Sequence, residues 1–403
     1  LKMKRFKRFL AAASVSAMLV SLAACGESGE SDSSTIKIGA IYPVTGNYAY
    51  EAEALVNTSQ MAIDYINSNG GIASLGGAQL ELVIGDSQGS ADTAAAEAER
   101  LISEGCVALT GTFQSATVQT ASQVSEENGV PFLISISANV SLMERGFQYL
   151  YRIQPNSEVY SLDMIDALNS LDLGGIQTAV LIHEDSITGT DNAAIIAENF
   201  DSTGLELLDN ISYSTSATSL STEVTRIAEL DPDMLICIGY FSDTSMLMRE
   251  INERGLTFDL ICGVSNGAFS DPQFIEDFGA QAENICDLNY RYNPLKQSTI
   301  DLLAEYAETY GNAMSVHAIY GWESILVIAD ALERAASTDP EDLNNALKAT
   351  SITDHDLAFS GPIEFDETGE NPNAAGVLIQ IQDGKQVVIW PEEFAEADFR
   401  TNS

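Results

Sequence analysis

The sequence predicts an α/β protein made of two doubly wound, Rossmann-like lobes with parallel central sheets. Two observations carry this prediction. Short apolar segments alternate with amphipathic segments along most of the chain, and the alternation runs through two successive series. The order is typical of parallel sheets, because each crossover helix returns the chain to the same end of the sheet. At 403 residues the chain is also long enough for two domains with sizeable cores.

The first series of alternating elements begins at Ile36. Its predicted strands are 36–42, 80–84, 107–110 and 130–134. Its predicted helices are 51–67, 92–103 and 117–127, and Gly70-Gly71 ends the first of them. These segments predict one doubly wound lobe.

The second series follows Arg152, after a weak break at 154–156. Its predicted helices are 158–171, 191–200, 219–230 and 243–254, and its predicted strands are 179–182, 205–211, 234–238 and 258–262. The last third of the chain predicts helices at 297–311 and 316–336, then a few strands between Pro362 and Trp390. This series predicts a second lobe of the same kind.

The N-terminus has the pattern of a targeting segment. Five cationic residues lie within the first eight, and an apolar run at 9–23 is too short to span a membrane. Leu22-Ala23-Ala24-Cys25 then resembles the bacterial lipobox, in which the cysteine carries a diacylglycerol. We therefore expect a signal peptide at 1–24 and a lipid-anchored, flexible tether at 25–34, on the extracytoplasmic face of the cell membrane. The alternative is an ordinary secretory peptide with a chance cysteine.

The composition is strongly acidic, with a formal net charge of −41 at pH 7. A surface of this sign repels nucleic acid and anionic lipid headgroups, so neither is an expected partner. It is typical of a solvated, soluble coat. No segment after the leader approaches the length of apolar chain that a permease helix needs.

The sequence predicts neither a metal site nor a cofactor site. Cys106, Cys237, Cys262 and Cys286 lack CxxC spacing and paired histidines, so buried thiols are expected, with a disulfide among the last three left open. The acidic segment 366–373 lacks the spacing of an EF-hand. Walker A and dinucleotide-binding motifs are also missing from the sequence.

Small polar residues follow the predicted strands. In open α/β sheets, ligands bind beyond the carboxyl ends of the strands, so these residues are the candidate site. They are hydroxyl, amide, glycine and tyrosine residues, found in segments 45–50, 86–87, 111–115, 135–139, 239–240 and 263–267. Such side chains recognise a small polar molecule through hydrogen bonds and ring packing.

Several motifs in order resemble one known family. They are Ile36-Lys37-Ile38-Gly39-Ala40 with Thr45-Gly46, Ala62 to Asn67 with Gly70-Gly71-Ile72, Gly111 to Ser115 with Pro131 to Ala138, and Gly361 to Asp366 with Gly369. Together they are similar to the type I periplasmic-binding fold, in particular to the Leu/Ile/Val-binding family, over residues 36–392. The order and spacing of the motifs make this resemblance specific.

The resemblance implies a domain organisation and a role. Lobe 1 would comprise 35–154 and 289–376, and lobe 2 would comprise 155–288 and 377–398. Three hinge segments near 153–157, 286–292 and 374–380 would join them. Such a protein captures a small amino-acid-like ligand between its lobes, closes over it and delivers it to an ABC permease. We expect a monomer that is not an enzyme.

The resemblance also implies ligand-binding residues. Ser115 would hold the ligand carboxylate, helped by backbone N–H groups at the start of its helix. The backbone carbonyl of Ser137 would accept from the ligand ammonium, with Ala138 in the same segment and Asn139 near the carboxylate. Two aromatic residues complete the set, Tyr240 as a cover from lobe 2 and Tyr50 in the first-lobe turn that reaches the cleft.

Three site residues depart from the family pattern. Thr188 stands where family members commonly have a tyrosine, and Ser265 and Asn266 stand where they commonly have an acid for the ammonium. A buried ammonium without a carboxylate is costly. Either Asp243 or Asp185 substitutes, or the ligand lacks a free α-ammonium.

Two other functions remain open. The first is a ligand-binding sensory protein of the same fold. Such a protein captures its ligand and closes over it in the same way as a transport protein does, so the sequence does not separate the two roles. Gly263-Val264-Ser265-Asn266-Gly267 matches the G-x-S-x-G pattern of serine hydrolases, with His317 or His355 as the base. A nucleophile elbow launches a helix at once, whereas residues 268–272 intervene here. We therefore expect a loop that lines the cleft.

Overall fold

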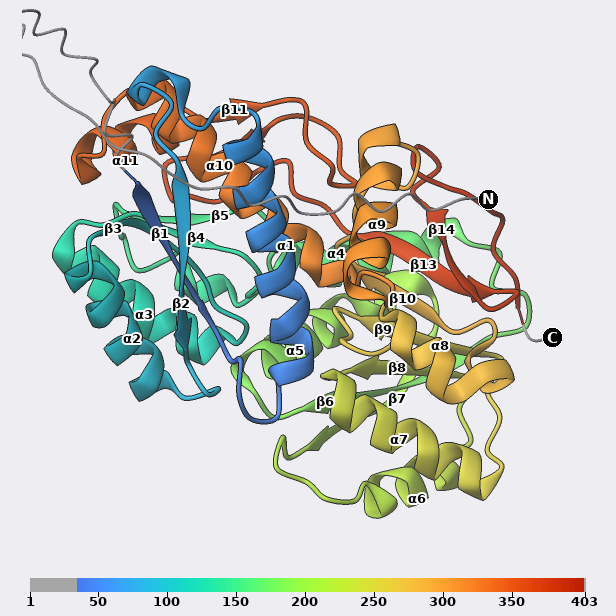
Figure 1. Cartoon of the computed structure of the whole chain (residues 1–403). Coiled ribbons are helices and arrows are strands. Elements are labelled where there is room, and N and C mark those ends of the chain that lie inside the picture. The colour runs from blue at the N-terminus through green and yellow to red at the C-terminus, as the bar shows by residue number, and fades with distance from the viewer. Residues whose placement is uncertain (1–34, 402–403) are drawn as a thin grey trace, which may run out of the picture. The chain divides into compact units, whose positions relative to one another are not determined.

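Two central sheets organise the chain (Figure 1). The computed structural model describes residues 35–401, which belong to one compact unit. The predicted signal peptide, tether and Cys25 lie outside the described residues. Among 35–401 no helix is both long and apolar enough to cross a membrane.

The first sheet has five parallel strands in the order β2-β1-β3-β4-β5. Its strands are β1 (Ile36–Tyr42), β2 (Leu80–Asp86), β3 (Cys106–Gly111), β4 (Phe132–Ile134) and β5 (Leu150–Arg152). Most of their residues are apolar and buried, as in strands covered on both faces. The strand order reverses between β1 and β3, so the loops after these strands open a crevice at that point.

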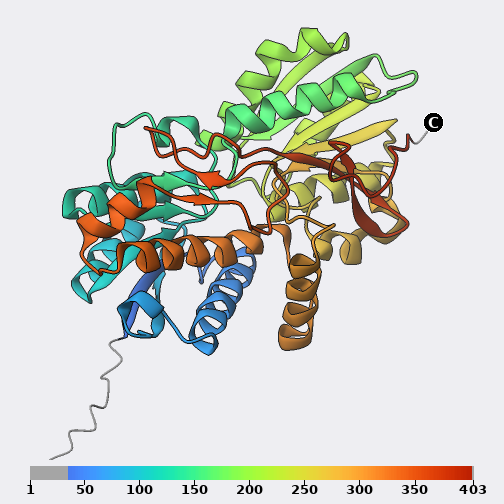
Figure 2. The same ribbon diagram turned by 90° about the horizontal axis from the view of Figure 1, so that it is seen from above.

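Helices cover both faces of the first sheet. α1 (Ala49–Ser68) and α10 (Ile319–Ala335) pack side by side on one face, as Figure 2 shows, together with α9 (Gln297–Tyr310) and α11 (Pro340–Lys348). α2 (Ala91–Ser103) and α3 (Ser115–Asn128) cover the other face. The two cores of this lobe therefore lie on opposite sides of one sheet.

The second sheet has seven strands in the order β14-β13-β10-β9-β8-β6-β7. Its strands are β6 (Thr178–Glu184), β7 (Glu206–Tyr213), β8 (Met234–Ile238), β9 (Leu260–Val264), β10 (Cys286–Asn289), β13 (Val377–Gln382) and β14 (Lys385–Trp390). The order reverses between β6 and β8, which sets a second crevice after those strands. A small hairpin pairs β11 (Ser351–Ile352) with β12 (Ile363–Glu364).

The second sheet is also covered on both faces. α4 (Ser157–Ser170) and α5 (Ile187–Asn199) pack on one face. α6 (Ser221–Leu230), α7 (Phe241–Arg254) and α8 (Pro272–Phe278) pack on the other. The predicted pair of doubly wound lobes is confirmed.

The chain passes between the two lobes three times. It leaves the first sheet after β5, returns to the first lobe after β10, and enters the second sheet again at β13. The lobe boundaries predicted after residues 154, 288 and 376 fall within or beside these passages. The exact residue at which each lobe ends stays a prediction.

The structure differs from the predicted elements in several places. β13 runs antiparallel to its neighbour β10. β14 runs antiparallel to β13, because a tight turn at Asp383-Gly384 joins these two strands. β5, α8 and α11 were not predicted. Both missed helices begin with proline after a capping aspartate (Asp271-Pro272 and Asp339-Pro340), a helix-start signal that the sequence did contain.

The four cysteines outside the leader are free thiols. Cys106, Cys237, Cys262 and Cys286 are all buried. Cys262 and Cys286 are register partners on neighbouring strands, yet no disulfide joins them. The disulfide that the sequence left open is therefore not formed, and buried thiols are confirmed.

Candidate functional site: a cavity between the two lobes

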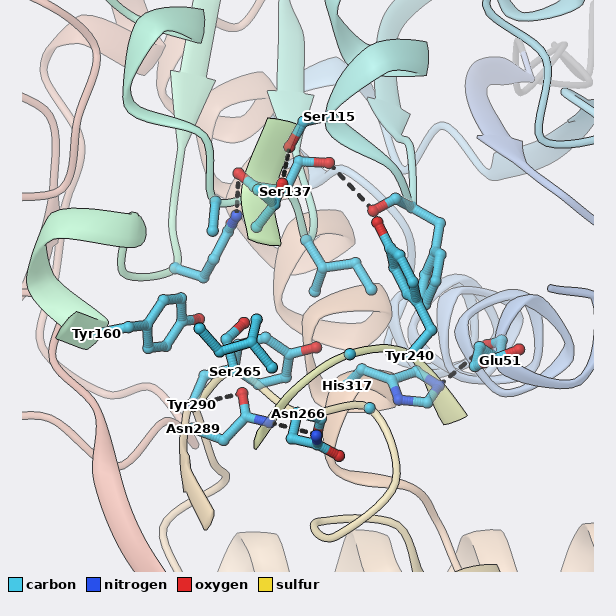
Figure 3. Close-up of a pocket in the computed structure, with 18 of the residues that line it drawn as sticks. Glu51, Ser115, Ser137, Tyr160, Tyr240, Ser265, Asn266, Asn289, Tyr290 and His317 are labelled. Carbon is cyan, nitrogen blue, oxygen red and sulfur yellow. Dashed lines mark hydrogen bonds between the residues drawn. The ribbon is translucent and has the colours of Figure 1, made fainter. Parts of the chain in front are cut away.

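A buried cavity lies where the carboxyl ends of the two sheets face each other (Figure 3). Loops and helix starts of both lobes line it, as do residues next to the passages between them. The lining residues are Glu51, Phe113, Ser115, Ile136, Ser137, Ala138, Gln154, Tyr160, Glu184, Thr188, Ile238, Gly239, Tyr240, Ser265, Asn266, Gly267, Asn289, Tyr290, Val316 and His317. Seven of the nine predicted ligand residues are among them.

Ser115 and Thr188 join the lobes at one end of the cavity. Their hydroxyl oxygens lie 2.8 Å apart, and the Ser115 hydroxyl also accepts from the backbone N–H of Asn139 at 3.4 Å. Ser115 is the first residue of α3, and Thr188 lies in the first turn of α5. The sequence predicts that this helix begins at residue 191, whereas α5 begins at Ile187. The Ser186 hydroxyl caps the helix and fixes its earlier start.

The start of α3 is suited to an anion. Backbone N–H groups in the first turn of a helix have no intrahelical partner and carry partial positive charge. Gln114, the N-cap residue of α3, makes no side-chain hydrogen bond to these groups. A ligand carboxylate at Ser115 would meet both a hydroxyl and the helix N-terminus.

The segment 137–139 is held by Arg152. Its guanidinium donates to the carbonyls of Ser137 (3.0 Å) and Asn139 (2.8 Å) and pairs with Glu370. The Ser137 carbonyl also accepts from Nε2 of Gln154 at 2.8 Å. Both lone pairs of the Ser137 carbonyl are thus occupied, so its predicted contact with a ligand ammonium does not fit this geometry.

Two predicted residues, Asn139 and Tyr50, lie outside the cavity wall. The Asn139 amide turns away and donates to Asp191 at 3.1 Å. The Tyr50 hydroxyl donates to Asp271 of the second lobe at 2.9 Å, and its ring packs on Phe241 with centroids 5.4 Å apart. Tyr50 therefore connects the two lobes and does not line the cavity.

Aromatic rings close the side of the cavity near the second lobe. The Tyr240 ring packs against Tyr48 (centroids 5.2 Å apart) and Phe113 (6.0 Å), both from the first lobe. Gly239, just before it, lets the backbone approach closely, since a Cβ there would lie 2.5 Å from the Tyr213 hydroxyl. Tyr240 thus stands where the sequence predicts a cover.

The acids at the cavity are Glu184 and Glu51, not the predicted Asp185 or Asp243. The Glu184 carboxylate accepts from the Ser186 backbone N–H and, at 2.7 Å, from its hydroxyl. Burial raises the pKa of Glu184 to about 7 and that of Glu51 to about 7. Asp185 accepts from the Thr215 N–H and Asp243 from the Tyr213 hydroxyl, both outside the cavity wall.

The sequence missed Glu184 because β6 is longer than predicted. The expected strand ended at Ile182, whereas the observed strand runs to Glu184. Glu184 is therefore the last strand residue, at the carboxyl end of β6 where ligand contacts are expected. His183, before it, is buried and bonds the Glu184 carbonyl at 2.8 Å.

Among residues 35–401, no lysine or arginine lines this cavity. Its one imidazole, His317, is bonded to the Ser315 hydroxyl (3.0 Å) and the Glu51 carbonyl (3.1 Å), and burial lowers its pKa to about 4. Within 35–401 no group of three or more metal-ligating side chains is assembled. An anionic ligand group would therefore depend on hydroxyl and backbone N–H donors.

Ser265 and Asn266 line the cavity opposite Ser137 in Figure 3. Ser265 has φ +49°, a left-handed conformation that is uncommon for serine. The Asn266 amide is occupied within the protein: Oδ1 accepts from the Ala268 N–H at 2.9 Å, and Nδ2 donates to Thr244 at 3.1 Å. Asn266 therefore shapes its loop, while its side chain has little capacity left for a ligand.

The geometry lacks two features of a serine hydrolase. The helix after Ser265 begins only at Pro272, whereas a nucleophile elbow leads straight into a helix. The sequence predicts this lack of an immediate helix, although it does not predict α8 itself. Among the described residues, no histidine is hydrogen-bonded to the Ser265 hydroxyl. His355, the other predicted base, bonds the carbonyl of Gly361.

Known proteins are similar to this chain over most of its length. The Leu/Ile/Val-binding protein homolog 8 of Brucella abortus (strain 2308) is 29% identical over 381 residues, covering 91% of this chain and 93% of the relative. The branched-chain amino acid transporter substrate-binding protein LivJ of Streptococcus pneumoniae, solved with isoleucine, gives a TM-score of 0.76 at 20% identity, covering 91% of this chain and 99% of that one.

A second solved structure shares the fold but holds a different ligand. The ABC-transporter solute-binding protein of Rhodopseudomonas palustris BisB5, solved with 3,4-dihydroxybenzoic acid, gives a TM-score of 0.75 at 20% identity, covering 91% of this chain and 98% of that one. The family model described as periplasmic binding protein matches residues 35–386. This span covers both lobes, and the chain belongs to the periplasmic binding protein family.

Proposed function

We propose that this chain captures a small zwitterionic amino acid between its lobes and delivers it to an ABC importer. One observation carries the proposal: the helix start at Ser115, which suits an anion, and the buried carboxyl group of Glu184 line the same cavity. The first suits a ligand carboxylate and the second a ligand ammonium. The relatives named for Leu, Ile and Val support this ligand class.

Charge separates an amino acid from an aromatic acid as ligand. A carboxylic acid without an ammonium would bring a negative charge beside Glu184, and no lysine or arginine among the described lining residues would offset it. An ammonium offsets the charge of Glu184 when that carboxyl is ionised. The cavity volume of about 70 Å³ suits a compact ligand rather than a peptide.

A thermal-shift panel tests the ligand class. The described domain is heated with amino acids, aromatic acids, short amides and purines. A ligand at about a hundred times its Kd adds about 2.7 kcal/mol to stability, which is a shift of a few degrees. The proposal expects shifts from α-amino acids. It fails if only ligands without an ammonium raise the melting temperature.

We infer further that Cys25 anchors the chain by lipid and that the site binds without turning its ligand over. Cells that lack the chain should lose uptake of the labelled ligand, and Cys25→Ser should release the protein from the membrane. If uptake persists but a ligand-dependent response is lost, the role is sensory. Labelling of Ser265 by a fluorophosphonate would contradict the non-enzymatic assignment.

A further inference from the structure

Two buried polar atoms at one end of the cavity lack a partner. This hinge end is lined by Gln154, Tyr160, Asn289 and Tyr290, which lie next to the passages between the lobes. Among the described residues neither Oε1 of Gln154 nor the hydroxyl of Tyr160 has a hydrogen-bond partner, although the two residues are 1% and 0% exposed. A buried polar group without a partner costs about 1–3 kcal/mol, so such atoms in a binding cavity point to a ligand.

The hydrogen-bonding character of both atoms is fixed. Nε2 of Gln154 donates to the carbonyl of Ser137, which accepts only, so the free atom of this amide is the carbonyl oxygen. Burial raises the pKa of the Tyr160 hydroxyl well above its ordinary value, so this group stays protonated and can both donate and accept. In Figure 3 the Tyr160 hydroxyl points toward Ser265, into the space between the lining residues.

The neighbouring Asn289 amide does not hydrogen-bond to Oε1 of Gln154 or to the Tyr160 hydroxyl. The Asn289 amide accepts from the Tyr290 backbone N–H at 2.9 Å and donates to the Asn266 carbonyl at 3.1 Å. Among the described residues, the hinge end therefore offers a buried free acceptor on Gln154 and a buried free hydroxyl on Tyr160. An aliphatic side chain there leaves both without a partner.

We propose that the ligand side chain ends in a neutral hydroxyl or carboxamide, which donates to Gln154 and accepts from Tyr160. The inference rests on the proposed function, because it assumes an α-amino acid in the cavity. A carboxylate would set its acceptor oxygens against the Gln154 carbonyl, and an ammonium would leave the Tyr160 proton without an acceptor. A hydroxyl or carboxamide satisfies both residues. Gln154 and Tyr160 are then specificity-determining residues.

Calorimetric titration with two matched ligand pairs tests this inference. Threonine differs from valine by a hydroxyl in place of a methyl group, and asparagine matches leucine in shape with an amide in place of two methyl groups. The polar member of at least one pair should bind about tenfold or more tightly than its apolar partner, since a site built for a hydrogen bond rejects the analogue that lacks it.

Tyr160→Phe removes only the hydroxyl and should reduce this preference by at least about fivefold. Tyr151→Phe is the matched control, because that buried hydroxyl bonds Asn344 outside the cavity, and the preference should persist. Equal or tighter binding of valine and leucine by the unmodified chain overturns the inference while the amino-acid function stands. Binding of none of the four, with shifts only from ligands that lack an ammonium, overturns both.

Discussion

The hydroxyl groups of Ser115 and Thr188 lie 2.8 Å apart and connect the first turn of α3 in one lobe to the first turn of α5 in the other. Two helix N-termini therefore meet at this end of the cavity. The Glu184 carboxylate already accepts from the Ser186 N–H at the start of α5. The start of α3 has no such carboxylate, which leaves it for the ligand.

Ser115→Ala should weaken ligand binding by about tenfold to a hundredfold, because it removes a hydroxyl that would donate a hydrogen bond to the charged ligand carboxylate. Calorimetric Kd values measure the loss. Ser122→Ala is the matched control: it removes a buried serine hydroxyl of the same helix, one that bonds Val118 and Arg145 away from the cavity. The control should lower the melting temperature and leave Kd unchanged. Equal Kd values for Ser115→Ala and the parent would remove Ser115 from the site.

Glu184→Gln should cost at least about thirtyfold in affinity for an amino acid, since removing one partner of a buried charge pair costs about 2–5 kcal/mol. Asp185→Asn removes a neighbouring, exposed acid and should have little effect. The same titrations should show that Glu184→Gln gains affinity for acids without an ammonium, relative to the parent. If Asp185→Asn loses more affinity than Glu184→Gln, the ligand ammonium pairs with Asp185, as the sequence suggested, and not with Glu184.

Tyr50→Phe should reduce affinity by about threefold to tenfold without changing ligand preference, because it removes one hydrogen bond between the lobes. Small-angle scattering should show a larger radius of gyration for the unliganded variant. Tyr310→Phe is the control, since its hydroxyl bonds Asn57 within the first lobe. A changed ligand preference in Tyr50→Phe would place this side chain at the ligand instead.

The unliganded chain should become less stable as pH rises from about 5 to 7.5. Burial raises the pKa of Glu51 and Glu184 to about 7, and that of Asp243 and Asp271 to about 6. A carboxyl with a raised pKa holds its proton longer in the folded state than in the unfolded state. Its contribution is therefore present at low pH and lost as pH rises through the folded pKa.

Melting temperatures measured across this pH range test the prediction, and the melting temperature should fall by a few degrees from the low to the high end. The double variant Glu51→Gln, Glu184→Gln should flatten this slope. The exposed pair Glu53→Gln, Asp185→Asn changes the net charge equally and should leave it steep. Identical slopes for the two double variants would assign the effect to the general negative charge of the surface.

The fold was predictable because its signals are local. Strand-length apolar runs such as 36–42 and helices with apolar stripes are determined by neighbouring residues, and β1 has the bounds the sequence predicts. The antiparallel pairing of β13 with β10 and the short strand β5 depend on partners elsewhere in the chain, so local pattern does not indicate them.

The site was only partly predictable for the same reason. Ser115, Thr188 and Tyr240 follow strands or begin helices, which are positions that sequence can locate. The free acceptor on Gln154 exists only because its amide nitrogen bonds Ser137, and Asn139 leaves the cavity because Asp191 accepts from it. These outcomes depend on side-chain pairing across the fold.

Calorimetric titration of the unmodified chain tests the recognition of a zwitterion most directly. The amino acid with the largest thermal shift is compared with its deaminated acid and its decarboxylated amine. Each analogue should bind at least about thirtyfold more weakly than the parent amino acid. The deaminated acid leaves Glu184 without an ammonium, and the decarboxylated amine leaves the helix start at Ser115 without a carboxylate. If the deaminated acid binds as tightly as the parent, Glu184 does not receive an ammonium and zwitterion recognition is contradicted.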